Sequence, residues 1–354
     1  MNKIKLNETP VRTSRNFNIN NIKLENVNIP EVTGKFENIE IVKGSSKVRI
    51  SENCSEINLS KGLNDFFTSQ VKEKANKKLQ LVIDCKSNKE TSINFGFDKD
   101  NLNLIEDVEI IANEGAKATV VLKYQSEEDL ECYHNGIVRV NAGKDSKVNI
   151  ILVNLMNSSS NNFVAIENNL QENAKVNLTI IDFGGKNSIT NYYSNLVGEA
   201  SDNRLNTIYL GKENQVFDLN YIAELRGKKS NIDMEVQGAL KDSAKKHFKG
   251  TIDFKKGCKK ATGNENEACM LLSDTARSIA LPMLLCSEED VEGNHSSSAG
   301  KIGDKELFYI MSRGFELKEA QKLMVRARFN KILESIKNED LKELILEEID
   351  KRLG

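Results

Sequence analysis

The sequence predicts a mainly β protein: a parallel β-helix, or solenoid, followed by a small α-helical domain. From about Leu79 onwards, short strand-like segments and polar turns alternate for nearly two hundred residues. No stretch between them has the pattern of an amphipathic helix, which argues against a fold of alternating strands and helices. A phrase that recurs every 27 to 30 residues favours the solenoid over its alternative, an antiparallel β-sandwich.

The recurring phrase consists of a polar turn, a small residue, a lysine and a strand. Three copies are E-G-A-K-A-T-V-V-L, K-D-S-K-V-N-I-I-L and E-N-A-K-V-N-L-T-I, whose lysines are Lys117, Lys147 and Lys175. Looser echoes follow at Arg204, Asn231 and Lys259. One coil cannot bury its own apolar face, so the repeat indicates stacked coils that share a continuous core.

The residues before the repeat predict an arm, two strands and a helix. Residues 1–35 are polar and rich in Asn, and we interpret them as a loosely ordered arm or linker. Residues 36–43 and 47–51 show strand patterns, and apolar residues at helical spacing predict a helix over about 63–77. We therefore assign residues 36–302 to the solenoid core, with this early helix packed on a sheet.

Residues 303–354 predict three helices. Asp304 is placed to cap the first helix, and Gly314 can end it in a left-handed conformation. The second helix begins near Lys318, and Asn338 suits the N-cap of the third. Such a domain either caps the solenoid or docks a partner protein, and the pattern alone leaves both possibilities open.

The composition argues against several functions. Lys and Arg number 50 against 52 Asp and Glu, which leaves no net field to attract nucleic acid or an anionic membrane. No apolar run is long enough to span a bilayer, and the N-terminal residues lack the apolar region of a secretory signal, so we expect a cytoplasmic protein. Without a G-x-x-x-x-G-K-[ST] motif, we expect no nucleotide to bind this chain itself.

His295 is the best candidate for chemistry. It lies in E-G-N-H-S-S-S, which we interpret as a polar bend between two apolar segments. Imidazole can ligate iron, zinc or copper or carry a proton, although a loop histidine with one hydrogen bond would give the same pattern. The neighbouring serines do not indicate a hydrolase, because the G-x-S-x-G motif is absent.

The six cysteines are scattered and form no C-x-x-C pair. Cys286 lies nine residues before His295, so thiolate and imidazole could together ligate an iron–sulfur cluster or zinc if the bend brings them close. Cys269 is a weaker candidate in the same region. The alternative for each thiol is simple burial in the core.

Several motifs resemble the SufB/SufD family, the core subunits of the SUF iron–sulfur cluster assembly machine. They are H-F-K-G-T-I-D-F-K-K-G-C-K-K-A-T, M-L-L-S-D-T-A-R, D-V-x-x-x-H and L-F-Y-I-M-S-R-G-F-x-x-x-E-A. The resemblance covers roughly residues 247–336, and the solenoid region is similar only in style.

The resemblance implies a right-handed parallel β-helix whose helical domain binds a SufC-type ABC ATPase. It also implies pairing through the β-helix with a SufB-type subunit or a second copy, and a transient iron–sulfur cluster at that interface. His295 matches the histidine of the family's SufD motif. The candidate residues for binding the ATPase are Leu307, Phe308, Tyr309, Arg313, Gly314, Leu323 and Met324.

Two departures make the chain resemble the SufD-type partner rather than the cluster-bearing SufB. Gly293 stands where the SufD motif usually has a cysteine, and Glu267 stands at the position of the SufB cluster cysteine. We therefore expect a non-catalytic scaffold subunit. The alternatives are a homodimeric, self-sufficient cluster scaffold and a solenoid polysaccharide-binding protein or lyase, of which the last predicts a secretion signal and exposed aromatic residues.

Overall fold

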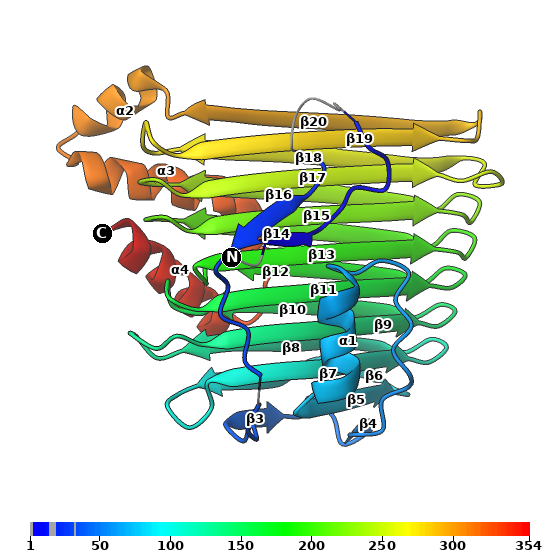
Figure 1. The fold of residues 1–354 in the computed structure, drawn as a ribbon. Helices are drawn as coiled ribbons and strands as arrows, with labels where there is room; N and C mark the ends of the chain where they lie inside the picture. Colours follow the sequence, from blue (N-terminus) through cyan, green and yellow to red (C-terminus); the bar gives the residue numbers. More distant parts are fainter. Residues whose placement is uncertain (1–2, 14–18, 32) are drawn as a thin grey trace.

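The computed structural model describes residues 3–13, 19–31 and 33–354, and it confirms the predicted fold class. The chain winds as a parallel β-solenoid from β6 (Lys86–Phe97) to β20 (Val291–Lys301), and helices follow (Figure 1). Each coil contributes one strand to each of two sheets, and within the described residues each of these sheets has nine strands.

We name the two walls by what covers them. The helix-side sheet, in spatial order, contains β20, β18 (Ala261–Leu271), β16 (Asn231–Leu240), β14 (Asp202–Gly211), β12 (Lys175–Asp182), β10 (Lys147–Leu155), β8 (Lys117–Ser126), β6 and β3 (Ile39–Val42). The arm-side sheet contains β19 (Arg277–Cys286), β17 (Lys245–Phe254), β15 (Val216–Leu225), β13 (Asn187–Leu196), β11 (Asn161–Leu170), β9 (Tyr133–Ala142), β7 (Asn103–Ala112), β5 (Lys77–Ile83) and β4 (Val48–Ser51). At the first coil β3 and β4 pair antiparallel, with β6 and β5.

The recurring phrase forms one corner of the solenoid. Lys147 pairs in register with Lys117 on one side and with Lys175 on the other. The residue two positions before each lysine is left-handed, with φ of 65° at Gly115, 57° at Asp145 and 55° at Asn173. Gly, Asp and Asn tolerate this conformation best, which explains why they recur in the turn.

Two of the three looser echoes of the repeat, at Arg204 and Lys259, are displaced, whereas Asn231 is in register. Lys175 pairs with Asp202, two residues before Arg204, and Asn231 pairs with Asp202 and with Thr262, three residues after Lys259. The inward apolar positions determine the register, because a slip of one residue would turn them outward. The lysines are exposed and do not constrain it.

The N-terminal arm is more ordered than the sequence suggested. Strands β1 (Lys3–Leu6) and β2 (Ile22–Glu25) pair antiparallel, and their apolar side chains are buried against the arm-side sheet together with helix α1 (Asp65–Lys74). Asn7 is fully buried and donates to the Asp218 carboxylate at 2.7 Å and to the Thr190 carbonyl at 3.1 Å. Residues 1–2, 14–18 and 32 of the predicted arm lie outside the described part of the chain.

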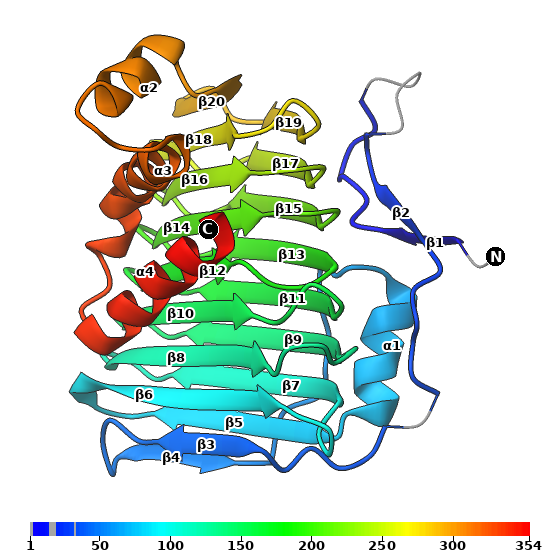
Figure 2. The same ribbon diagram turned by 90° about the vertical axis from the view of Figure 1, so that its left-hand side faces the viewer.

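Three helices end the chain, namely α2 (Asp304–Met311), α3 (Leu317–Leu333) and α4 (Glu339–Leu353). Gly303, not Asp304, occupies the N-cap position of α2. Helices α3 and α4 pack on the outer face of the helix-side sheet, opposite the arm and α1 (Figure 2). No helix in the described residues is long and apolar enough to cross a membrane.

Because α3 and α4 lie on a wall, they leave the end of the solenoid open. The segment that we interpreted as a polar bend around His295 is the final strand, β20, paired along its whole length with β18. That interpretation was wrong, because the polar residues around His295 do not reflect a turn. As part of the terminal coil, β20 is exposed on both faces, so it carries polar residues without being a turn.

Candidate functional site at the open end of the solenoid

The last coil presents two free strand edges. Among the residues that the structure describes, β19 pairs only with β17, and β20 pairs only with β18. Free edges carry unpaired N–H and C=O groups that can accept a strand from another chain. Almost every side chain of β20 is exposed, and Ile279 and Leu284 of β19 are exposed apolar residues.

His295 lies near the middle of β20, in register with Glu265 of β18. Ala261 and Cys269 belong to the solenoid core, so alternation along β18 directs Glu265 and Glu267 inward as well. Their partners on β20, His295 and Ser297, share that face. His295 is exposed and makes no hydrogen bond or ion pair within the described residues.

The other two histidines are less accessible. His134 is fully buried and shares hydrogen bonds with Glu106 at 3.2 Å and Asn162 at 2.7 Å. His247 lies beside Asp218 on the outer face of the arm-side sheet, and burial lowers its pKa. His295 is therefore the histidine that a partner or a cargo at the open end can reach.

Glu267 is the centre of a buried polar cluster. It accepts hydrogen bonds from Lys246 at 2.6 Å, from Ser297 at 2.7 Å and from the Tyr209 hydroxyl at 3.1 Å. Lys246 and Glu267 are both fully buried, so their charges compensate each other inside the solenoid. Each oxygen of the carboxylate thus has at least one hydrogen-bond donor.

Tyr209 reaches Glu267 from two coils away. In the intervening coil the stacked position is Gly238, and a Cβ there would lie 1.8 Å from the Tyr209 ring. The ring therefore occupies the space that a side chain would fill. Burial, followed by the proximity of Cys269 and Glu267, raises the pKa of Tyr209 well above its ordinary value, so its hydroxyl stays a donor.

Glu265 differs sharply from its neighbour Glu267. Its side chain is 2% exposed, yet neither carboxylate oxygen has a hydrogen-bond partner. It extends across the interior to Gly250 of β17, where a Cβ would come within 2.1 Å of a carboxylate oxygen. Burial and the charge of Glu267 raise the pKa of Glu265 to about 8.

The structure does not bring the predicted thiol ligand to the histidine. Cys286 ends β19 in the arm-side sheet, where its Sγ donates to the Glu288 carbonyl at 2.9 Å. His295 lies on the opposite wall, four residues into β20, or about 13 Å along the strand. This separation exceeds the combined reach of the two side chains to a shared metal ion.

Cys269 is also a poor ligand as it stands. It is buried, and burial raises the pKa of its thiol despite the nearby Lys246 and hydrogen bonds with Tyr209 and Ser278. A protonated thiol is neither a nucleophile nor a metal ligand. In residues 3–13, 19–31 and 33–354, no group of three or more His, Cys, Asp and Glu side chains is arranged to hold a metal ion.

Sequence reasoning missed Glu265, Lys246 and Tyr209. A usable signal was present for the first of these, because Glu265 and His295 are 30 residues apart, which matches the length of one coil. Lys246 and Tyr209 gave no local signal, since only the stacking of coils places them beside Glu267.

A second candidate surface lies on α2 and the start of α3. Phe308 is 75% exposed, Tyr309 is 58% exposed, and Leu323 is exposed as well. The Arg313 guanidinium lies 5.0 Å from the Tyr309 ring centre and donates to its hydroxyl at 2.8 Å, which holds both side chains on the surface. Gly314 has a φ of 97° at the end of this segment.

Two of the predicted contact residues lie deeper. Leu307 and Met324 pack partly against the core between the helices and the helix-side sheet. Three apolar residues that sequence reasoning did not select are exposed on the same segment: Met311, Phe315 and Leu317. We call the exposed set, comprising Phe308, Tyr309, Met311, Phe315, Leu317 and Leu323, the α2–α3 patch.

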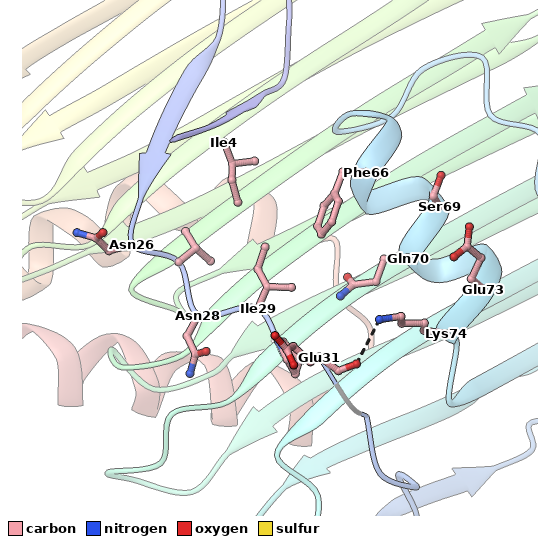
Figure 3. Close-up of a pocket in the computed structure, with 12 residues that line it drawn as sticks. Ile4, Asn26, Asn28, Ile29, Glu31, Phe66, Ser69, Gln70, Glu73 and Lys74 are labelled. Atoms are coloured by element: carbon pink, nitrogen blue, oxygen red, sulfur yellow. Dashed lines mark hydrogen bonds between the residues drawn. The ribbon is translucent and has the colours of Figure 1, made fainter. Parts of the chain in front are cut away.

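A cavity of about 670 Å³ lies between the N-terminal arm and α1 (Figure 3). Its apolar side is formed by Ile4, Val27, Ile29 and Phe66. Across it, Lys74 donates to the Glu31 carbonyl at 3.2 Å, which joins α1 to the arm. The arm and α1 pack on the outer face of the arm-side sheet, so the cavity lies on that side of the solenoid.

Comparison with known proteins identifies the family. A sequence model described as "SUF system FeS cluster assembly, SufBD core domain" matches residues 93–328, which is more than half of the chain. The match begins in β6 and ends in α3, so it includes the open end and the α2–α3 patch. It also extends well into the coils where the sequence resemblance was only one of style.

Individual relatives agree with this match. The chain is 25% identical to the iron–sulfur cluster assembly protein SufD of Bacillus subtilis over 252 residues and 26% identical to that of Escherichia coli over 240 residues. These segments cover 71% and 68% of this chain and 58% and 57% of the two relatives. A SufBD family protein of Pyrococcus horikoshii is 30% identical over 171 residues, 48% of this chain and 37% of that protein. The chain belongs to the SufB/SufD family of the SUF system, as a SufD-like member.

Proposed function

We propose that this chain is a non-catalytic scaffold subunit of SUF iron–sulfur cluster assembly. Its open end pairs with a SufB-type subunit, and its α2–α3 patch binds a SufC-type ABC ATPase. The observation that carries this proposal is the pair of long, free strand edges, β19 and β20, next to an accessible histidine. Because the chain belongs to a family of cluster assembly proteins, we assign the assembly interface to that end of the solenoid.

The free edges support pairing with another solenoid. Strand addition would satisfy the main-chain groups of both edges at once. The exposed Ile279 and Leu284 on β19 supply apolar contact, whereas β20 is polar and suits hydrogen bonding across the interface. A partner solenoid with the same kind of open end fits this mixed surface.

The α2–α3 patch supports docking of a second protein. Six apolar or aromatic side chains, Phe308, Tyr309, Met311, Phe315, Leu317 and Leu323, are exposed on adjoining segments. Exposed aromatic residues beside an Arg are typical of binding hot spots. Because α3 also packs on the helix-side sheet, movement of a bound ATPase would act directly on the solenoid wall.

The cluster-forming thiolates would come from the partner subunit. Glu267, at the position of the family's cluster cysteine, is already bonded to Lys246, Tyr209 and Ser297. Cys269 is buried and protonated, and Cys286 lies on the other wall. This chain therefore contributes His295 and a shaped wall to the interface.

Co-purification tests the proposal. The tagged chain is co-expressed with a SufB-type subunit and a SufC-type ATPase from the same genome, and the same is done for F308A/Y309A. Since both side chains are exposed, the variant should fold and retain the SufB-type subunit while losing the ATPase. Failure of the wild-type chain to capture either protein would refute the proposed role.

The homodimeric alternative has its own outcome. The same free edges can pair two copies of this chain, which would appear as a dimer in light scattering of the purified protein. A stable homodimer that excludes the SufB-type subunit would favour the self-sufficient scaffold. Family membership already argues against a polysaccharide-binding protein or lyase.

A further inference from the structure

We propose that the cavity between the N-terminal arm and α1 binds an extended peptide segment of another protein, in which an apolar anchor side chain is flanked by Lys or Arg. The arm and α1 lie on the wall opposite α3 and α4 (Figure 2). An occupant of the cavity and a protein on the α2–α3 patch can therefore bind at the same time. The proposal does not depend on the function proposed above, because it uses neither that patch nor the free edges of β19 and β20.

The first argument is the size and lining of the cavity. Its volume of about 670 Å³ lies within the range of about 300–1,000 Å³ that is typical of ligand sites. On the arm, Ile4, Val27 and Ile29 are half-buried at its edge. The Phe66 ring points towards them from α1 and is 51% exposed (Figure 3). An apolar side chain inserted between the arm and α1 would cover this ring.

The second argument is a hydrogen-bond donor that the chain does not use. Gln70 of α1 lines the cavity and is only 7% exposed. Its Oε1 accepts hydrogen bonds from the Tyr133 hydroxyl and from the Asn135 amide, both at 2.7 Å. The same Asn135 nitrogen donates to the Phe67 carbonyl at 3.0 Å, so it is a nitrogen that faces Gln70. This contact fixes which atom of the Gln70 amide is the oxygen.

The other atom of that amide, Nε2, is left to the cavity. Among the described residues it donates a hydrogen bond to none. The Gln70 side chain extends from α1 towards Ile29 on the arm (Figure 3). A main-chain carbonyl of a bound segment would accept from Nε2. Peptide-binding domains combine such main-chain hydrogen bonds, which give affinity, with apolar pockets, which give specificity.

The third argument is the charge around the cavity. Its charged lining residues are two acids, Glu31 and Glu73, and one base, Lys74. The Lys74 ammonium is engaged by the Glu31 carbonyl at 3.2 Å. Both carboxylates are exposed, and neither has an ion-pair or hydrogen-bond partner in the part of the chain that the structure describes. The rim therefore attracts a Lys or Arg beside the anchor and repels acidic segments.

Selection from a phage-displayed library of random heptapeptides on the purified chain tests the proposal. The library is first passed over Phe66→Ala, which removes peptides that bind elsewhere. We expect the enriched peptides to share an apolar residue close to a Lys or Arg. Enrichment of acidic peptides, or of no common pattern, would overturn the proposal.

Fluorescence anisotropy with an enriched peptide then measures each contact. F66A should weaken binding at least about tenfold, because the anchor loses one wall. Gln70→Glu should weaken it about fivefold or more, because it keeps the acceptor for Tyr133 and Asn135 but removes the donor. Glu73→Lys should weaken it about threefold or more, and less so at high salt. Wild-type affinity in all three variants would place the peptide outside the cavity.

Two variants outside the cavity serve as matched controls. Val42→Ala truncates an apolar side chain of β3 that is 52% exposed, and Glu56→Lys reverses an exposed carboxylate near the arm-side sheet. Neither residue lines the cavity, so both variants should bind the peptide as the wild type does. Thermal melting of every variant shows that it is folded. Equal weakening by F66A and by Val42→Ala would count against the cavity as the binding site.

Discussion

Lys246 of β17 and Glu267 of β18 form an ion pair of 2.6 Å that is fully enclosed by the solenoid. The Lys246 ammonium also lies 5.9 Å from the centre of the Tyr209 ring and 5.7 Å from that of Phe248. The pair joins the two walls of one coil at the level directly below the open end. Its burial makes it costly to break, because either charge would remain in the core without its partner.

We expect Glu267→Gln to destabilise the chain by about 3–5 kcal/mol, because it leaves the Lys246 ammonium buried without a counter-charge. The measurement is a shift of the urea midpoint, followed by circular dichroism. The double variant K246M/E267Q removes the unpaired charge and should recover part of the loss. A midpoint for E267Q equal to that of the wild type would show that solvent reaches this pair.

Gly238→Ala should be strongly destabilising, because the added Cβ would meet the Tyr209 ring at 1.8 Å. The ring cannot move aside without losing its bond to Glu267, so we expect about 2 kcal/mol or more, as for overpacked cores. Thermal melting measures the effect. Gly300→Ala on β20 is the control, since no atom lies within 4 Å of a Cβ there. Equal melting temperatures for the two variants would contradict the packing account.

The regular coils were predictable from the sequence because the corner of each coil requires residues that tolerate a left-handed backbone and a small buried side chain. Asp145 and Asn173 tolerate the left-handed turn, and the small residues after them, Ser146 and Ala174, fit into the buried corner. The phrase therefore recurred, and its copies pair in register. The displacement at Arg204 arose because the exposed lysine position is free to vary, whereas the buried positions are not.

The site was less predictable, because it depends on contacts between coils. His295 could be selected from its motif, but the partners of Glu267 lie 58 and 21 positions earlier and 30 positions later in the chain. The order of the arm was equally hidden, since Asn7 bonds to residues 183 and 211 positions away. Local patterns do not contain such contacts. The final strand was interpreted as a bend for a related reason. No further coil packs on the terminal coil, so its residues need not be apolar.

The stability of the chain should depend on pH through Glu265. Burial, then the charge of Glu267, raises the pKa of this carboxyl from 4.5 to about 8. Between these values the folded chain keeps a proton that the unfolded chain releases. The stabilising contribution is therefore complete below about pH 4.5 and is lost as the pH rises towards 8. The slope in this window is at most about 1.4 kcal/mol per pH unit.

Melting temperatures of the wild type and E265Q, measured in EDTA from about pH 5.5 to 8, test this dependence. The wild type should lose stability relative to E265Q as the pH rises, because glutamine does not titrate. Parallel profiles for the two proteins would show that Glu265 has an ordinary pKa.

Leu284→Glu should abolish pairing of the solenoid with a SufB-type subunit. Leu284 lies on the free edge strand β19 and is 39% exposed, so the change places a charge in the proposed interface at little cost to the isolated chain. Burial of that charge in the interface is costly unless the partner subunit places an opposite charge beside it. Co-purification measures the loss, and thermal melting of the isolated chain should stay close to that of the wild type.

Val197→Glu is the matched control for this change. Val197 is 38% exposed, follows β13 in the middle of the solenoid, and lies far from both free edges. It tests whether a new charge on an equally exposed apolar residue is enough to disturb the complex. We expect V197E to retain both partners and L284E to retain only the ATPase, whose patch lies on α2 and α3. Loss of the SufB-type subunit from both variants, or from neither, would move the pairing surface away from the open end.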